Sequence, residues 1–231
     1  MPDTTTDGAG RPGTLFPGRG DREVAGEEPS WNLLQDQAVG CTRCRLHEAR
    51  SHVVFGEGDC DADLVFIGAA PGLHEDLQGK PFVGAAGNLL TNLLFENRLQ
   101  RSDVYVCNVV KCRSPGGREP LLDEVEACSR FLRKQLLLLS PRVIVTLGGV
   151  ATGLMLGRTV AIDKVAGYRF QTHGATLIPT YHPDLAVRGS LQAMGALRRD
   201  VRVAKGVLDG RIATAYEALT ELRAGQTATE T

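Results

Sequence analysis

Residues 64–90, LVFIGAAPGLHEDLQGKPFVGAAGNLL, decide the fold of this chain. The apolar run Leu64–Ile67 stops at Gly68 and Pro71-Gly72, which predicts a buried strand ending in a sharp turn. Further along, leucines at helical spacing predict a helix over Asn88–Leu99. Ligands of open α/β folds bind beyond the carboxyl ends of strands, so this turn is a candidate site. A purely structural glycine-rich turn is the alternative.

Strand patterns alternate with helical patterns along the rest of the chain. The expected strands are Leu64–Ala69, Val104–Val110, Val143–Leu147 and Thr176–Thr180, with His52–Phe55 as a short edge strand. The expected helices are Asn88–Leu99, Leu121–Leu139, Val150–Leu156 and Leu191–Leu208. This alternation predicts an α/β fold in which helices cover both faces of a mostly parallel sheet. We expect a disordered leader over 1–29, one domain over 30–208, and a C-terminal helix or flexible tail over 209–231.

Composition limits the classes of protein to consider. The chain has 231 residues, 42% of them hydrophobic, which suits one domain with a real core. The net charge of −1 gives no global basic field, but it leaves room for a local basic groove. Neither a membrane-spanning stretch nor a signal-peptide pattern is visible. We therefore expect a cytoplasmic protein in a reducing compartment, where six cysteines stay thiols.

Four cysteines have the pattern of a metal centre. Cys41 and Cys44 form a C-x-x-C pair, and Cys112 and Cys128 follow on a later strand end and helix. Four thiolates suit either Zn²⁺ or an iron–sulfur cluster, and spacing alone does not separate the two. Four unrelated buried thiols are the alternative. A thioredoxin-like motif is disfavoured, because its C-x-x-C follows a strand and this one follows a helix.

Polar groups stand at the ends of two further strands. Asn108 ends the second strand, where a buried amide is either a satisfied structural group or one that reads a base edge. His182 ends the last strand, and Pro183 holds it extended. The basic, turn-rich loop Lys111–Pro120 suits phosphate contacts or is simply solvated. If the sheet is parallel, these groups meet the first turn at one edge.

With these residues assembled, the chain resembles the family 4, iron–sulfur type of uracil-DNA glycosylases. The resemblance rests on the stretch 68–90, on NVVKCRSPGGREP at 108–120, on HPDLAVR at 182–188, and on the cysteine set. It implies a three-layer α/β/α sandwich with a central, mostly parallel four-stranded sheet. It also implies uracil-containing DNA as substrate and a structural [4Fe-4S] cluster. The implied cluster ligands are Cys41, Cys44, Cys112 and Cys128.

The resemblance also implies roles for individual residues. Such an enzyme flips deoxyuridine out of the duplex, stacks the base on an aromatic ring and stabilises the charge that develops on the departing pyrimidine. The implied catalytic residues are His182, Glu75 and Asp76. The implied uracil-binding residues are Gly68, Ala70, Gly72, Phe82, Asn108 and His182. The implied contacts to the DNA backbone are Arg113, Arg118 and Arg188.

One departure from the family pattern motivates an alternative. Ala69 stands where the family often has a glutamate that positions water. A lesion-binding protein with weak or altered glycosylase activity is therefore the second hypothesis. Covalent capture of the abasic sugar by His182 ranks low, because the stretch 174–182 is short and lacks basic residues. A zinc-dependent α/β hydrolase is a third possibility, but His182 lacks nearby ligand partners and the cysteines use up the metal-binding capacity.

We further expect a monomer that has no membrane partner and is associated with the nucleoid. A sliding clamp is left open as a protein partner.

Overall fold

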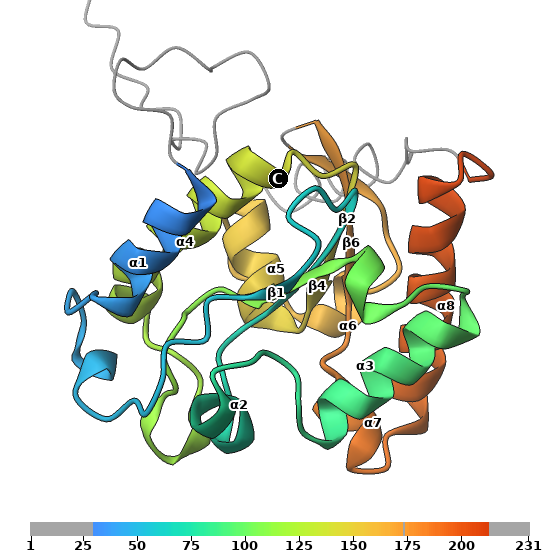
Figure 1. Ribbon diagram of the computed structural model, residues 1–231. Coiled ribbons are helices and arrows are strands. Elements are labelled where there is room, and N and C mark those ends of the chain that lie inside the picture. Colours follow the sequence, from blue (N-terminus) through green and yellow to red (C-terminus); the bar gives the residue numbers. More distant parts are fainter. Residues whose placement is uncertain (1–29, 173, 213–231) are drawn as a thin grey trace, which may run out of the picture.

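A mixed sheet between two layers of helices organises the chain in the computed structural model, which describes residues 30–172 and 174–212 (Figure 1). The strand order in the sheet is β1 (Glu57–Gly58), β3 (Tyr105–Asn108), β2 (Leu64–Gly68), β4 (Val143–Leu147), β6 (Ala175–Thr180) and β5 (Phe170–Thr172). The four central strands, β3, β2, β4 and β6, run parallel. The predicted four-stranded parallel core is therefore confirmed.

Two short antiparallel strands extend this core at its edges, which the sequence analysis did not foresee. They are β1 (Glu57–Gly58) beside β3 and β5 (Phe170–Thr172) beside β6. The edge strand expected at His52–Phe55 is not formed there. That segment is instead tied to loops, since Val54 N–H donates to the Lys111 carbonyl at 2.8 Å. The sheet thus has six strands.

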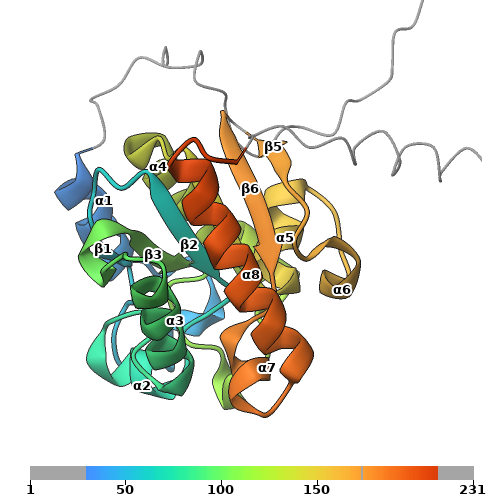
Figure 2. The ribbon, with the colours of Figure 1, turned by 90° about the vertical axis from the view of Figure 1, so that its right-hand side faces the viewer.

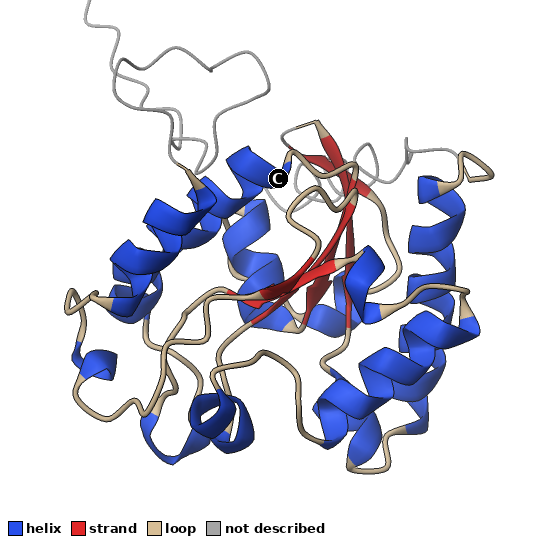
Figure 3. Ribbon diagram, in the orientation of Figure 1, coloured by secondary structure: helices blue, strands red, loops and turns tan. Residues whose placement is uncertain are grey.

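The helices form one layer on each face of the sheet. Their bounds are α1 (Trp31–Val39), α2 (Leu73–Gln78), α3 (Ala85–Glu96), α4 (Leu122–Leu139), α5 (Gly149–Leu156), α6 (Ile162–Val165), α7 (Pro183–Val187) and α8 (Leu191–Leu208), with 3-10 turns η1 (Arg45–His47), η2 (Arg101–Asp103) and η3 (Pro115–Gly117). Helices α1, α4 and α5 cover one face, and α3, α7 and α8 cover the other (Figures 1 and 2). Figure 3 shows the strands enclosed between these layers. This arrangement confirms the three-layer prediction.

Alternation along the strands divides the core between the two faces. On β2, Val65 and Ile67 pack toward α1, α4 and α5, whereas Leu64 and Phe66 pack toward α3 and α8. All four side chains are fully buried. Parallel strands covered on both faces have such continuous apolar runs, which is why the strands were visible in the sequence.

Some expected elements differ from the structure or lie outside it. The six-residue helix α2 follows Gly72 and is not among the helices predicted from the sequence, and α3 begins at Ala85 rather than Asn88. The leader predicted for 1–29 and nearly all of the tail predicted for 209–231 lie outside the described residues. None of the described helices is long and apolar enough to cross a membrane.

A buried polar network stabilises the face that packs against α4. Gln135 on α4 donates from Nε2 to the Tyr105 hydroxyl at 2.9 Å and to the Phe55 carbonyl at 3.0 Å. Its Oε1 accepts from the ammonium of Lys111 at 2.6 Å, and this ammonium also donates to the Asn108 carbonyl at 2.7 Å. Gln135 and Lys111 are 0% and 1% exposed, so these two side chains depend on the network for their hydrogen bonds.

Replacing Gln135 by leucine should lower the free energy of unfolding by about 2 kcal/mol or more, because several buried polar groups lose a partner. Chemical denaturation measures this loss. Gln192 is the matched control: its Nε2 also donates to a tyrosine hydroxyl, that of Tyr181 at 2.8 Å, but Gln192 is exposed. Gln192→Leu should change stability by less than about 0.5 kcal/mol. Equal losses in the two variants would contradict the role given to the buried network.

Candidate functional site

The site begins where β2 ends, and glycine is required there by close packing. A Cβ on Gly68 would lie 2.4 Å from Oδ1 of Asn108 and 2.6 Å from Cζ of Phe82. Gly68 pairs with Asn108 in the parallel register of β2 and β3. The glycine therefore lets the amide of Asn108 and the ring of Phe82 approach the same point beyond the sheet.

A cavity of about 380 Å³ opens at this edge of the sheet. Its wall comes from the segment after β2, the end of β3, the η3 loop and the start of α7. The lining residues are Ala69, Ala70, Pro71, Gly72, Leu73, His74, Glu75, Phe82, Gly84, Ala85, Ala86, Asn108, Gly117, Arg118, Glu119, Pro120, His182 and Asp184. The structure thus brings Phe82, Asn108 and His182 together, as the sequence predicted. Gly68 lies behind these side chains.

Asn108 presents an unused acceptor at this cavity. The residue is 2% exposed, and its Oδ1 has no hydrogen-bond partner among the residues that the structure describes. A buried carbonyl oxygen without a partner is costly, and native proteins rarely keep one without a reason. Its position indicates that a ligand N–H completes the site.

His182 is held in one tautomer by the backbone that follows it. It is the N-cap of α7, and its Nδ1 accepts from the Asp184 N–H at 3.2 Å. The proton of a neutral ring must then be on Nε2, which becomes a donor. Burial lowers the pKa of His182, although the charges of Asp184 and Glu75 oppose that shift. The ring lies 5.9 Å from that of Phe82, so donor and aromatic wall share the cavity.

The two acidic residues of α2 have different surroundings. Glu75 lines the cavity, and its Oε1 accepts from the N–H groups of Val83 and Gly84 at 3.1 and 3.3 Å. Asp76 is 1% exposed and lies outside the cavity lining. Its Oδ1 and Oδ2 both accept from Ser51 N–H, at 2.9 and 3.1 Å. Asp76 therefore stabilises the loop around Ser51, and only Glu75 is placed to act on a ligand.

The three arginines expected on the DNA backbone are also placed differently. Arg118 lines the cavity, but two of its nitrogens donate to the carboxylate of buried Glu124 at 2.8 and 2.6 Å. This contact holds the pKa of Glu124 below its usual value. Arg113 lies 3.8 Å from the carboxylate of Asp76, and Arg188 is exposed at the end of α7. Arg188 is therefore the most open of the three.

Sequence reasoning missed several residues of the site. His74, Glu119 and Asp184 line the cavity without having been singled out. Of these three, only Asp184 could have been predicted from the sequence. It follows His182-Pro183 at the start of a helix, where its backbone N–H can donate to the side chain of the N-cap residue.

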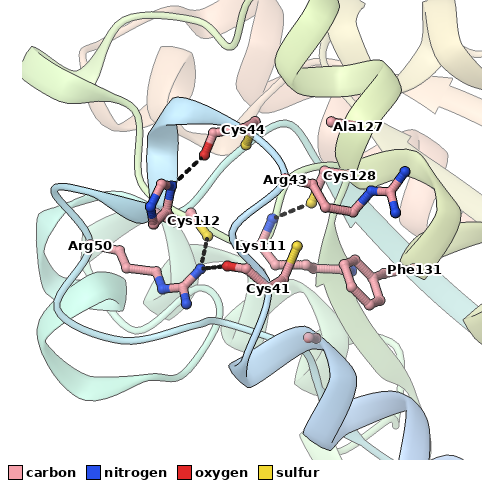
Figure 4. Close-up of a pocket in the computed structure, with 11 residues that line it drawn as sticks. Cys41, Arg43, Cys44, Arg50, Lys111, Cys112, Ala127, Cys128 and Phe131 are labelled. Carbon is pink, nitrogen blue, oxygen red and sulfur yellow. Dashed lines mark hydrogen bonds between the residues drawn. The ribbon is translucent and has the colours of Figure 1, made fainter.

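The four cysteines of the predicted metal centre surround one small cavity between η1, the segment after β3, and α4 (Figure 4). All four are free thiols. Arg50 donates to Sγ of Cys112 at 3.3 Å, and the backbone N–H of Lys111 donates to Sγ of Cys128 at 3.2 Å. Burial raises the pKa of Cys128 to about 11, and it also raises the pKa of Cys112. Buried sulfurs that receive N–H bonds, with cationic Arg50 beside them, fit a thiolate-bound metal centre.

Comparison with known proteins agrees with this geometry. The model of the uracil DNA glycosylase superfamily matches residues 55–202. The chain is 42% identical over 184 residues to the type-4 uracil-DNA glycosylase of Thermotoga maritima, covering 78% of this chain and 96% of that protein. It is also 42% identical over 165 residues to the type-4 enzyme of Saccharolobus solfataricus, covering 68% and 76%.

One solved structure, that of wild-type Pedobacter heparinus SMUG2, matches with a TM-score of 0.46 and 12% identity over 65% of this chain and 77% of that one. The family match and the identities over most of the chain decide the assignment: the chain belongs to the uracil DNA glycosylase superfamily and, within it, to the type-4 uracil-DNA glycosylases.

Proposed function

We propose that this protein removes uracil from DNA by hydrolysing the N-glycosidic bond and leaving an abasic site. The observation that carries the proposal is the unpartnered Oδ1 of Asn108, buried beside Phe82 and His182 at one cavity. The N3–H of uracil is the donor that this oxygen lacks. A base inside a duplex cannot reach such a cavity, so the nucleotide must be flipped out of the stack.

Asn108 supplies the choice of base. Its Oδ1 accepts from uracil N3–H while its Nδ2 donates to the neighbouring carbonyl oxygen. Cytosine presents the reverse pattern on the same edge and would leave the buried amide unpaired, which is strongly disfavoured. Phe82 forms a wall on which the base stacks, and such stacking is worth about 1–3 kcal/mol per base.

His182 supplies stabilisation of the transition state. As the glycosidic bond breaks, negative charge builds on the departing pyrimidine, and the Nε2–H donor of the neutral ring is directed at that charge. Such a donor acts more strongly on the transition state than on the ground state. Removing a comparable donor from an oxyanion site costs about 2.7–4 kcal/mol.

Glu75 is the acidic residue that we assign to the sugar and the attacking water. Its Oε1 is used by backbone N–H groups, which leaves Oε2 for this task. Ala69 also lines the cavity but has no group that could position water. A dissociative mechanism requires little base strength, so the loss of a glutamate there is compatible with turnover. The relatives named above are glycosylases, which favours the enzyme over a lesion-binding protein.

The DNA strand would cross the mouth of this cavity. We assign backbone contacts to Arg188 first, and to Arg113 and Arg118 as far as their carboxylate partners leave their donors free. Charge on phosphates makes such contacts salt-dependent. Because its substrate is DNA, we further propose that the protein is intracellular and acts at the nucleoid, and we keep a monomer as the proposed state.

We propose that Cys41, Cys44, Cys112 and Cys128 hold a [4Fe-4S] cluster. Within the described part of the chain, no three His, Cys, Asp or Glu side chains are placed to hold a single metal ion. What supports the cluster is that all four thiols line one small cavity and that Cys₄ ligation is typical of such clusters. When bound, the cluster would supply a structural cross-link, because its ligands lie in the segment after α1, in the segment after β3, and on α4.

Asn108→Asp tests the function most directly. A carboxylate offers two acceptors and no donor, so release of uracil from a single-stranded oligonucleotide should slow by about 30-fold or more, which corresponds to about 2 kcal/mol. Single-turnover assays at saturating enzyme measure the rate. Asn88→Asp is the control, since Asn88 is exposed on α3 away from the cavity lining, and it should leave the rate unchanged. A near wild-type rate for Asn108→Asp would contradict the assignment.

The acid dependence of the rate reports on His182. Burial holds its pKa in the folded protein below the ordinary 6.5, so the neutral ring still predominates at pH 6.5 and is protonated as the pH falls further. The single-turnover rate should therefore fall below pH 6.5, because a proton on Nδ1 ends the hydrogen bond from Asp184 N–H that orients the Nε2–H donor toward the pyrimidine. Stability contributed by the neutral ring is lost over the same acid range.

Asp184→Asn refines this test. The charge of Asp184 raises the pKa of His182, so its removal should move the falling limb to lower pH while the backbone N–H donor remains. A rate that rises on acidification through pH 6.5 would contradict a neutral histidine.

Metal analysis tests the cluster. The purified protein should contain about four iron atoms per chain and absorb broadly near about 400 nm. Cys128→Ala should abolish this absorption. Cys60→Ala should preserve it, because Cys60 is exposed and outside the cysteine cavity. One zinc ion per chain in place of iron would overturn the proposal.

A further inference from the structure

Phe82 has a backbone conformation that its side chain disfavours. Its φ is +53°, in the left-handed region that residues other than glycine, asparagine and aspartate seldom adopt. Such strain persists only where the surrounding structure holds it, and it concentrates at functional sites. The contacts that hold Phe82 in this conformation therefore matter for the site as well as for the fold.

The backbone is held on both sides of this residue. On one side, Nη2 of Arg101 donates to the Pro81 carbonyl at 2.7 Å. On the other side, Oε1 of Glu75 accepts from Val83 and Gly84 N–H. Arg101 and Glu75 together are called the Phe82 clamp below. The peptide groups before and after the strained residue are thus both fixed by charged side chains.

Arg101 reaches this point from elsewhere in the fold. It lies on η2, 20 positions after Pro81, and its side chain is 21% exposed. Its second partner is Glu57 of β1, whose carboxylate is 3.5 Å from Nη2 and also 3.5 Å from the ammonium of Lys80. Nη1 of Arg101 is buried without a hydrogen-bond partner among the described residues, so the guanidinium is held through Nη2. This nitrogen donates to the carbonyl that immediately precedes Phe82.

The position of the Phe82 ring leaves little tolerance. A Cβ on Gly87 would lie 1.7 Å from the Phe82 carbonyl oxygen, and one on Gly68 would lie 2.6 Å from Cζ of the ring. The backbone of α3 and the end of β2 therefore enclose the residue. If the Pro81 carbonyl were released, the peptide before Phe82 could rotate toward an unstrained conformation and carry the ring away from Asn108 and His182. Misplacement of about 1 Å is enough to reduce catalysis substantially.

We propose that Arg101 is a positioning residue for base stacking, which holds the strained Phe82 so that its ring forms the wall on which the flipped pyrimidine lies. The proposal rests on the proposed function. Arg101 lies outside all three sequence motifs and does not line the cavity, so it acts through Phe82 rather than on the substrate.

A double-mutant cycle tests this coupling. The four proteins are wild type, Arg101→Met, Phe82→Leu and the double variant, each shown to be folded by thermal unfolding. Two quantities are measured: the single-turnover rate on a single-stranded oligonucleotide with one deoxyuridine, and the dissociation constant of free uracil by ligand-observed NMR. Arg101→Met alone should reduce both the rate and the affinity by about tenfold, part of the value of one stacked base. In the Phe82→Leu background it should change either quantity by less than about twofold.

Two controls separate positioning from a general effect of charge. Glu57→Gln removes the ion pair of Arg101 but leaves the Pro81 contact, so both quantities should stay within about twofold of wild type. Lys205→Met removes a cation with the same 21% exposure from α8, where it pairs with Asp209, and it should have no effect on either quantity.

The outcomes are distinct. Equal losses from Arg101→Met in both backgrounds, or no loss in the wild-type background, would overturn the positioning role. If Arg101→Met does not fold, Arg101→Lys, which keeps the charge but not the planar fork, is used in the same cycle with the same criterion. A wild-type protein that releases no uracil would overturn the proposed function instead, and the uracil affinities of the cycle would still decide on the clamp.

Discussion

The contact between the end of β2 and the end of β3 is the constraint on which the site depends. Gly68 and Asn108 are register partners there, and only a residue without a side chain leaves room for the amide and for Phe82. Because all four central strands run parallel, β6 delivers His182 to the same edge. The parallel direction of the strands thus brings the polar side chains to one edge of the sheet, and the absence of a Cβ at Gly68 leaves room for them.

Much of the fold was readable because its central strands are buried on both faces. Such strands are continuous apolar runs, so β4 was predicted to the residue and the other three to within a few residues. The ends of these runs then indicated where two site residues would lie, because Asn108 stands near the end of the second run and Pro183 marks the end of the last strand at His182. The short edge strands were not readable, because β1 is a two-residue pairing with no apolar run of its own.

Side-chain partners were the part that sequence could not supply. Glu75 and Asp76 are neighbours in the chain, yet they point to different surroundings because successive helix positions face in different directions. Arg118 was expected on DNA from its place in a basic loop, and the structure pairs it with Glu124, which lies six positions along on α4. Arg101 had no signal at all, since its partner is a carbonyl oxygen.

The shortness of the two edge strands, β1 and β5, affects how readily copies of this protein aggregate. An open sheet margin offers unpaired backbone groups to which another polypeptide can add, and long flat margins promote aggregation. Here one margin is only two residues long, with Gly56 and Gly58 at positive φ, and the other is a three-residue strand turned back by a hairpin. Neither edge strand is long enough to pair well with a strand of another copy. We therefore expect little aggregation by strand addition, at high concentration or during folding.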